Sequence, residues 1–571
     1  MTCKRSLSFA SLLLIGGCTN TVDTGAGDQP LAVAAASVQL VGHHSKLNFH
    51  PVPNANTKTP GVSSPNVLPP ELIETAVAQG SIPLENPRSV TLADGTTHTA
   101  QDDGYNGDGP LLAAPGDLPS AGHLVEATKT EPDKNTYLVL DGQTGPDAAY
   151  DYGRHFLFQG HEGGTPGTIT RVNLDADASH RVTLLAVTDS SGAPLANIDG
   201  STWDPFTQRL IFTTENASGP EYQATLTFPS VVEDISGSIG RGGYEGVQND
   251  ADGNLWIVED VGGSTATATP HAKTPNSFVY RFVPTHRNSL KSGKLQVLQV
   301  TSLRSGQPIA FHDPATDTLS PDVGDLHTYG KVFKTSWVSI HDTAVDGTTP
   351  YSANALAKAK GGTPFKRPEN GQFRPGTDFR EFLFDETGDT DARTEAGATF
   401  DGFGGVFKLT QHSPSADSGT LQLVFLGDVA HTGLDNCSFV SKNDIVFVED
   451  AGDNLHAQRN ALDSAYVIDL TANYADPSQV PARLIAEGRD PSATLDSALG
   501  SFSGFQNEGD NEITGFHVSN GDPSARGLLG AATPRPFTDG WRVFYTQQHG
   551  DNVTWEILPS NGGSSPFGDD D

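Results

Sequence analysis

Several apolar stretches of the chain end in acidic residues beside glycine, an arrangement that could hold a cation. Residues 255–258 are apolar and rich in β-branched and aromatic side chains, and they run directly into Glu259 and Asp260, with a glycine pair at 262–263. Two carboxylates at the end of a buried strand are costly unless they are paired or bound to a cation. We therefore interpret Glu259 and Asp260 as either salt-bridged residues or metal ligands.

The same ending recurs at four other places in the chain. The acidic or metal-capable residues that follow these apolar stretches are His161 and Glu162, Glu215, Glu449 and Asp450, and His549. One such ending would mean little. Five of them predict a radial array of strands whose polar ends point to one place.

Oxygen donors dominate the residues that could carry chemistry. The sequence has no Cys-x-x-Cys, His-Glu-x-x-His, Gly-x-Ser-x-Gly or phosphate-loop motif. The motifs typical of zinc sites and of serine hydrolases are therefore missing. Carboxylates suit hard cations such as Ca²⁺, Mg²⁺, Mn²⁺ or Fe³⁺. The candidate metal ligands are Glu162, Glu215, Glu245, Glu259, Asp260, Glu449, Asp450, Glu508 and Glu512.

Arg367 and Glu369 form a second candidate constellation. In an extended segment, residues two apart point the same way. A guanidinium can clamp phosphate or carboxylate through two hydrogen bonds, while the neighbouring acid holds a metal or the arginine. We predict that this pair is catalytic; a surface ion pair on a loop is the alternative.

The stretch Asp250 to Asn254 resembles half of a calcium loop, but Val261 stands where the last ligand would be, so we predict a β-turn there.

The spacing of the strand ends predicts the fold. Glu162, Glu215 and Glu259 are 53 and 44 residues apart, and spacings of this size match one four-stranded blade of a β-propeller. We predict an all-β propeller of about six blades over residues 111–560, with loop insertions. The clearest insertion lies near 340–400 and includes a short helix at 353–360. Two packed β-sandwiches are the alternative, but they would not explain the repeated strand ends.

The two ends of the chain carry different signals. Lys4, Arg5, an apolar run and Gly17-Cys18 predict a lipoprotein signal peptide over residues 1–17 and acylation of Cys18; an ordinary signal peptide is the alternative. The protein would then be an outer-membrane lipoprotein, facing the periplasm or the cell surface, with a lipid anchor as its only membrane contact. Residues 18–110 are predicted to be a tether and N-terminal extension with one short helix at 72–78, and residues 561–571 an acidic tail.

The composition limits the possible partners. The chain has 35 Lys and Arg residues against 69 Asp and Glu, a formal net charge of −34. Such a surface repels nucleic acid and anionic lipid head groups and attracts cations. We therefore expect no nucleic-acid partner.

Several segments together resemble the PhoX-type bacterial alkaline phosphatases and their relatives. The resemblance covers most of residues 120–560. The segments that carry it are Glu245-Gly246 leading to residues 256–260, residues 278–284, Phe365-x-Arg367-x-Glu369, Leu434-Asp435-Asn436 before residues 448–450, Asn511-Glu512-x-Thr514-Gly515, and residues 546–550.

This resemblance implies a propeller whose centre holds an iron pair and calcium ions, with phosphate gripped by Arg367. It also makes Glu215, Glu245 and Glu369 metal-ligand candidates. Residues 197–205, which match the family's cysteine segment, contain no cysteine, so calcium is the expected cofactor and iron lacks one expected ligand. The implied function is metal-dependent hydrolysis of a phosphorylated small molecule or other phosphate ester. The alternatives are a non-catalytic calcium-binding propeller that binds a ligand or partner, and a calcium-dependent, lactonase-like hydrolase.

Overall fold

The computed structural model describes residues 48–58, 64–91, 97–106, 130–163, 166–489, 512–560 and 566–567. Cys18, Glu508, Asn511 and the acidic tail beyond Phe567 lie outside these ranges, so the predictions for them stay predictions. Within the described ranges strands dominate, and the longest α-helix is α6 (Gly452–Arg459). None of the helices there is both long and apolar enough to cross a membrane.

Four antiparallel sheets of four strands each form separate blades. The first blade contains β5 (Pro132–Val139), β6 (His155–His161), β7 (Ile169–Asn173) and β8 (Val182–Ala186). The second contains β9 (Ser201–Asp204), β10 (Arg209–Phe212), β11 (Tyr222–Ala224) and β12 (Val232–Asp234). Another contains β24 (Leu434–Phe439), β25 (Asp444–Glu449), β26 (Ser464–Asp469) and β27 (Ala482–Ala486). The last contains β28 (Glu512–Ser519), β29 (Arg542–Gln548), β30 (Val553–Pro559) and, at its edge, β1 (Leu72–Ala78).

A nine-stranded sheet lies between the second of these blades and the third. Its first run is β13 (Tyr244–Asn249), β14 (Leu255–Glu259), β17 (Val279–His286) and β18 (Ser289–Val300). Its other run is β20 (Gly371–Phe373), β21 (Glu381–Glu386), β22 (Gly405–Gln411) and β23 (Ser418–Leu426). The long strand β19 (Phe333–Asp342) pairs with β18 on one side and β23 on the other, so it joins two four-stranded runs into one sheet.

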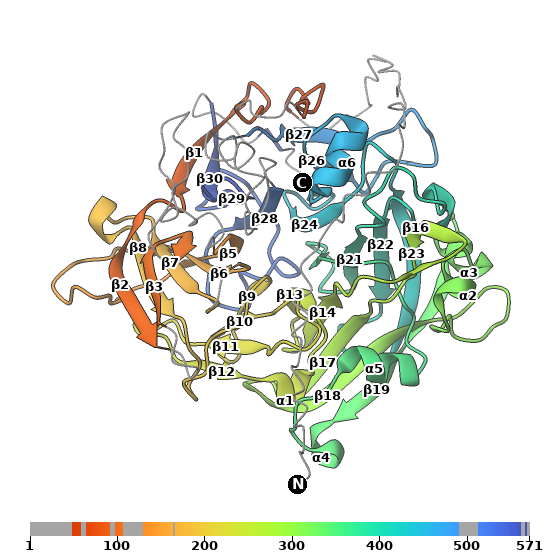
Figure 1. Ribbon diagram of the computed structural model, residues 1–571, viewed down its shortest axis with the longest axis horizontal. Helices are drawn as coiled ribbons and strands as arrows, with labels where there is room; N and C mark the ends of the chain where they lie inside the picture. Colours follow the sequence, from red (N-terminus) through yellow and green to blue (C-terminus); the bar gives the residue numbers. More distant parts are fainter. Residues whose placement is uncertain are drawn as a thin grey trace, which may run out of the picture. The chain divides into compact units, whose positions relative to one another are not determined.

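The innermost strands of these units contact one another in cyclic order, β5, β9, β13, β20, β24, β28 and back to β5. Figure 1 shows the sheets arranged around this centre. The all-β, propeller-like prediction is therefore confirmed. The ring has six innermost strands, although only four blades are separate sheets because β19 fuses the other two.

The five apolar stretches with polar ends are all second strands of blades. They form β6, β10, β14, β25 and β29, each paired with the innermost strand of its blade. Apolar side chains of these strands pack between neighbouring blades; Val446 and Val448 of β25, for example, share a core with Val543 and Tyr545 of β29. The predicted radial array of strand ends is thus present.

The helix predicted at residues 72–78 is wrong. These residues form β1, which pairs antiparallel with β30 and so completes the last blade with a strand from the N-terminal part of the chain. Ile73, Thr75 and Val77 alternate along it, and β-branched residues favour a pleated, half-buried surface. Their partner strand, β30, comes from the other end of the chain. The local sequence of residues 72–78 therefore cannot predict this pairing.

The remaining elements are short. A small sheet contains β2 (Pro83–Thr91), β3 (Thr97–Asp102) and β4 (Tyr105–Asn106), and a hairpin contains β15 (Thr265–Ala266) and β16 (Thr269–Lys273). The other helices are η2 (Ala178–His180), α1 (Ser236–Ile239), α2 (Pro314–Asp317), α3 (Pro321–Leu326), α4 (Thr343–Asp346), α5 (Ala353–Ala359) and η3 (Ala398–Phe400).

Two local predictions can be compared with these elements. The short helix expected at 353–360 is α5, but the same predicted insertion also contains the blade strands β20 and β21. The turn at residues 250–254 is confirmed, since the Asp250 carboxylate accepts hydrogen bonds from the backbone N–H groups of Asp252 and Asn254.

Candidate metal centre

Two groups of carboxylates lie at the inner ends of the blades. Site A consists of Glu162, Asp199 and Glu215, and site B consists of Glu245, Glu369 and Asp435. Within each site, one potential ligand atom from every residue lies within 4.8 Å of the others. Both sites offer only oxygen donors, which suit hard cations.

The six residues come from two kinds of position in the blades. Glu162 and Glu215 follow the second strands β6 and β10. Glu245 and Asp435 belong to the innermost strands β13 and β24, and Asp199 and Glu369 come just before β9 and β20. Each site thus draws on several blades, and the ring brings together residues that are far apart in sequence.

Lys134 of β5 links the two sites. Its ammonium group lies 2.9 Å from Glu245 Oε1 in site B and 3.3 Å from Asp199 Oδ1 in site A. Burial alone would lower the pKa of Lys134, but the surrounding carboxylates hold that pKa well above its usual range. Lys134 is therefore a permanent positive charge between the two sites.

Arg367 supplies the second fixed cation. Its Nε lies 3.0 Å from both carboxylate oxygens of Asp260, and its Nη2 lies 2.9 Å from Asp260 Oδ2 and 2.7 Å from Glu369 Oε1. Arg367 has a φ of 55°, so the segment is not extended as the sequence pattern suggested, yet Arg367 and Glu369 still touch. Among the described residues, Nη1 donates no hydrogen bond, and the side chain is 16% exposed.

Glu162, Glu215, Glu245, Glu369 and Asp435 hold protons more tightly than usual. Burial, together with the charges of Asp199 and Glu131, raises the pKa of Glu162 to about 8. Burial and neighbouring carboxylates also raise the pKa values of Glu215, Glu245, Glu369 and Asp435 well above their ordinary values. Asp260 is the exception: burial would raise its pKa, but Arg367 holds it below the usual range. Such shifts arise where like charges are crowded in a poorly solvated place.

His549 and Glu512 lie beside the two sites. His549 Nε2 is 3.0 Å from Glu512, and His549 Nδ1 is 2.8 Å from Glu131. Asp450 is an electrostatic neighbour of both Arg367 and His549. Glu131 and His549, like Arg367, have positive φ angles, of 51° and 65°. Left-handed backbone is unfavourable for these residue types and concentrates at functional sites.

The structure separates the two members of each Glu-Asp pair. Glu259 Oε2 accepts hydrogen bonds from the Phe278 backbone, the Tyr280 hydroxyl and Asn354, at 2.9 to 3.1 Å. Glu449 is held by Arg459, with both contacts at 3.1 Å. Because side chains alternate along a strand, the glutamate of each pair has these polar partners, while the following aspartate, Asp260 or Asp450, lies near Arg367. Neither glutamate joins site A or site B.

Three residues of this centre were not among the predicted site residues. Asp199 and Asp435 complete the two sites, and Lys134 joins them. All three lie in or next to innermost strands, whereas the predictive pattern was the polar ending of a second strand. Asp435 belongs to the motif Leu434-Asp435-Asn436 and Asp199 to residues 197–205, which match the family's cysteine segment, whereas Lys134 had no such signal.

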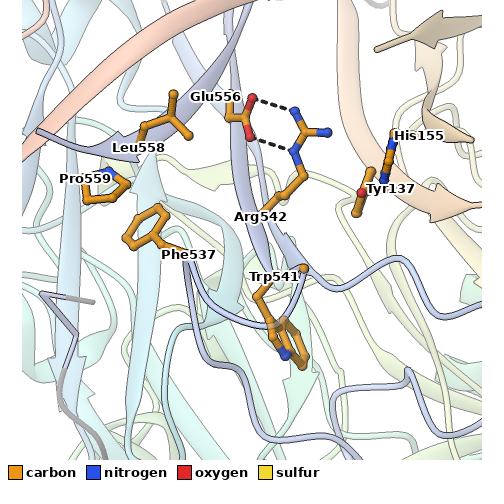
Figure 2. Close-up of a pocket in the computed structure, with 9 residues that line it drawn as sticks. Tyr137, His155, Phe537, Trp541, Arg542, Glu556, Leu558 and Pro559 are labelled. Carbon is orange, nitrogen blue, oxygen red and sulfur yellow. Dashed lines mark hydrogen bonds and ion pairs between the residues drawn. The ribbon is translucent and has the colours of Figure 1, made fainter. Parts of the chain in front are cut away.

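Two pockets lie near the innermost strands. A small polar cavity is lined by Lys134 and by the amides Asn135, Gln248, Asn370, Gln372 and Asn436, so it adjoins the metal centre. A second pocket, of about 270 Å³, is lined by Tyr137, His155, Trp541 and the ion pair of Arg542 with Glu556, as Figure 2 shows. It contains none of the carboxylates of site A or site B.

Comparison with known proteins was made by sequence and by structure. A family model described as alkaline phosphatase PhoX matches residues 272–520, a region that includes Arg367, Glu369 and Asp435. No match to a curated protein was found by sequence. The structure of Pseudomonas fluorescens PhoX in complex with vanadate, a transition-state analogue, is similar with a TM-score of 0.54 and 11% sequence identity, covering 91% of this chain and 100% of that one.

A fungal alcohol oxidase of the AA5 family, in complex with copper, aligns with a TM-score of only 0.19 at 12% identity, over 88% of this chain and 100% of that one. A score this low does not indicate a shared fold. At 11% identity the PhoX structure shows a shared fold. The similarity in sequence is shown by the family model, which matches residues 272–520. The resemblance to the PhoX alkaline phosphatase family is therefore confirmed, in sequence over residues 272–520 and in fold by the propeller.

Proposed function

We propose that this protein is a metal-dependent phosphatase that hydrolyses phosphate esters at the centre of the propeller. One observation carries the proposal: in the part of the chain that the structure describes, six carboxylates in two sites converge around two fixed cations, Lys134 and Arg367. Asp199, Glu245, Glu369 and Asp435 are buried, and buried carboxylates in such excess must either take up protons or bind cations. The PhoX resemblance supports the choice of phosphate esters as substrates.

The donor atoms support calcium as the cofactor. Site A and site B contain only carboxylate oxygens, the ligand type that Ca²⁺ prefers. Glu369 Oε1 is buried and in ion-pair contact with Arg367 Nη2 at 2.7 Å, but it accepts no hydrogen bond within the described residues, so it still has lone pairs to offer a cation in site B. Asp199 lies in the segment without cysteine and gives site A an oxygen where the resemblance implied a thiolate. When bound, a dication would act as a Lewis acid toward a phosphoryl oxygen and lower the pKa of a coordinated water.

Arg367 is placed to bind the phosphoryl group of a substrate. Asp260 and Glu369 occupy its Nε and Nη2 atoms and so fix the plane of the guanidinium. The Nη1 group is then the donor left for a phosphate oxygen. Donors that are already oriented stabilise the charge of a transition state without reorganisation. Lys134 would hold Asp199 and Glu245 in place and limit repulsion between the two sites.

The test is hydrolysis of a generic phosphomonoester at alkaline pH, with Ca²⁺ supplied alone or together with iron. Arg367→Lys should fold but lose on the order of 100-fold in turnover, because an ammonium group cannot replace the oriented fork. Glu369→Gln should lose activity through site B. Arg374→Lys is the matched control, since Arg374 forms a comparable ion pair with Glu381 at 2.7 Å outside the centre.

The same assay separates the alternatives. A folded, calcium-loaded wild type that hydrolyses no phosphomonoester would favour a non-catalytic propeller that binds cations and a ligand. Hydrolysis of lactones but not of phosphate esters would favour the lactonase-like alternative. Equal activity of the wild type, Arg367→Lys and Glu369→Gln would remove this pair from the reaction.

We also propose that Cys18 anchors the protein to the outer membrane through an attached lipid. The support is the sequence alone, namely Lys4-Arg5, a short apolar run and Gly17-Cys18. Cys18→Ser should release the protein into the soluble fraction of cells broken without detergent. Unchanged membrane association of that variant would contradict the proposal.

A further inference from the structure

A third group of potential metal ligands lies apart from site A and site B. His327, at the end of α3, has its Nε2 atom 2.8 Å from Glu386 Oε2 at the end of β21 and 3.5 Å from Asp401 Oδ1. One ligand atom of each residue lies within 4.8 Å of the others. The side chains are 2%, 1% and 0% exposed, so the group is closed to solvent.

Asp401 is the unusual member of this group. Neither of its carboxylate oxygens accepts a hydrogen bond within the part of the chain that the structure describes, although both are buried. Its backbone is left-handed, with a φ of 62°, and one oxygen is directed toward His327. Buried carboxylates nearly always have partners, and an unsatisfied one costs several kcal/mol. Among the described residues its one ion-pair contact is with His327 Nε2 at 3.5 Å, so Asp401 indicates a cation beyond those that the protein supplies.

The neighbouring blade shows how the protein neutralises a comparable pair of acids. Glu449 ends β25 as Glu386 ends β21, and there Arg459 lies between Glu449 and Asp463, 3.1 Å from each. No guanidinium takes that place between Glu386 and Asp401 in the described structure. The nearby Lys366 ammonium instead pairs with Asp389 at 3.1 Å, and only the Lys366 backbone N–H reaches Glu386, at 2.8 Å.

The ring of His327 is already oriented as a ligand. Its Nδ1 lies 2.8 Å from the Val323 carbonyl oxygen, and because a carbonyl only accepts, Nδ1 must carry the hydrogen. Phe407 packs edge-on against the ring. The Nε2 atom then faces the two carboxylates. A histidine that donates from one nitrogen to a carbonyl and presents the other to a ligand group is the usual arrangement in metal sites.

We propose that His327, Glu386 and Asp401 bind a divalent transition-metal ion, such as Mn²⁺ or Zn²⁺, in a structural site. One imidazole nitrogen with carboxylate oxygens suits these ions better than Ca²⁺, and both free oxygens of Asp401 are available. A dication balances the two carboxylates while His327 stays neutral, whereas an imidazolium would balance only one. Because solvent is excluded, the ion would stabilise structure and not react.

The site would also support the proposed reaction centre. Glu386 Oε1 holds the backbone N–H of Lys366, and the next residue is Arg367, whose positive φ must be maintained by its surroundings. The carbonyl oxygen of Arg367 accepts a hydrogen bond from Thr387, the residue after Glu386. The metal would thus fix the position of the segment that carries Arg367.

The test uses the full chain with Mn²⁺ as the probe. Pulsed electron paramagnetic resonance should detect a histidine nitrogen bound to Mn²⁺ in the wild type and in His549→Gln, which alters the histidine beside the central carboxylates. The nitrogen signal should disappear in His327→Gln. Asp401→Asn should bind one equivalent of Mn²⁺ fewer than the wild type, whereas Asp463→Asn, which removes an acid paired with Arg459, should keep the full number.

Three results would overturn the proposal: no nitrogen signal in the wild type, a signal that persists in His327→Gln, or an unchanged number of bound ions in Asp401→Asn. If His327→Gln does not fold, Asp401→Asn decides, because asparagine preserves the size of the side chain. None of these readouts depends on phosphatase activity.

Discussion

Lys134 Nζ lies 2.9 Å from Glu245 Oε1 and thereby places a lysine ammonium between two sets of carboxylates. Asp199, in the other set, is its second partner at 3.3 Å. The ammonium is a built-in counter-ion, but one charge cannot balance six carboxylates. The centre is therefore expected to depend on external cations for both stability and function.

Lys134→Met should make the fold strongly dependent on Ca²⁺. Removing one partner of a buried ion pair typically costs about 3–5 kcal/mol, and Glu245 and Asp199 would then repel each other. Ca²⁺ at 100 times its dissociation constant should restore roughly 2.7 kcal/mol if it binds only the folded state. Chemical unfolding with chelator and with Ca²⁺ measures both effects. Lys291→Met, which breaks the exposed pair with Glu233, should change neither value appreciably.

In the presence of chelator, stability should fall as the pH rises from about 4.5 to 8. Glu162 has an ordinary pKa of 4.5 when unfolded and a pKa of about 8 in the fold. Within this window the folded state keeps a proton that the unfolded state releases, so the free energy of unfolding decreases with pH. Saturating Ca²⁺ should remove most of this loss. A stability that rises with pH over the same window in chelator would contradict the carboxylate crowding.

His517→Gln should protect the fold from mild acid. His517 Nε2 accepts a hydrogen bond of 3.1 Å from the Tyr137 backbone N–H, which requires a neutral ring, and burial lowers the pKa of His517 to about 4. The unfolded histidine takes up a proton near pH 6.5, so wild-type stability should fall between pH 6.5 and 4, by ~1–3 kcal/mol. Glutamine can accept the same bond without titrating. Identical acid profiles for both proteins would exclude this role.

The adjacent acids Glu259 and Asp260 should respond differently to substitution. Burial raises the pKa of Glu259 well above its usual value, and its partners are neutral donors from which an amide oxygen can also accept, so Glu259→Gln should change stability by less than ~1 kcal/mol. Asp260→Asn removes the carboxylate that holds Arg367 and should lower both Ca²⁺ affinity and turnover. Calorimetric Ca²⁺ titration of both variants decides, and a larger loss in Glu259→Gln would reverse the assignment.

Much of the fold could be predicted because it depends on repeated local patterns. Each second strand reads as an apolar run with a polar ending, and five such endings, at β6, β10, β14, β25 and β29, were enough to predict the ring. The strand β1 could not be predicted, since its partner β30 lies almost 500 residues away and a seven-residue stretch does not specify its partner. Likewise, the fusion of two blades by β19 depends on long-range pairing.

The candidate site could be predicted only in part, for a reason that lies in strand geometry. The Glu-Asp pattern marks two adjacent carboxylates, but alternation directs only one of them toward the centre, and the sequence does not say which. Lys134 and Asp199 are single polar residues in or beside short inner strands, without a pattern that distinguishes them. Their role comes from the ring, which brings them beside Glu245.

The decisive measurement is phosphomonoester hydrolysis by the purified full chain, with the bound metals counted by elemental analysis in the same sample. We predict that the protein retains calcium, that chelation abolishes turnover, that added Ca²⁺ restores it, and that Arg367→Lys reduces it on the order of 100-fold while Arg374→Lys does not. A folded wild type that carries its metals and hydrolyses no phosphomonoester, or one whose turnover is unaffected by chelation and by Arg367→Lys, would contradict a metal-dependent phosphatase at the centre of this propeller.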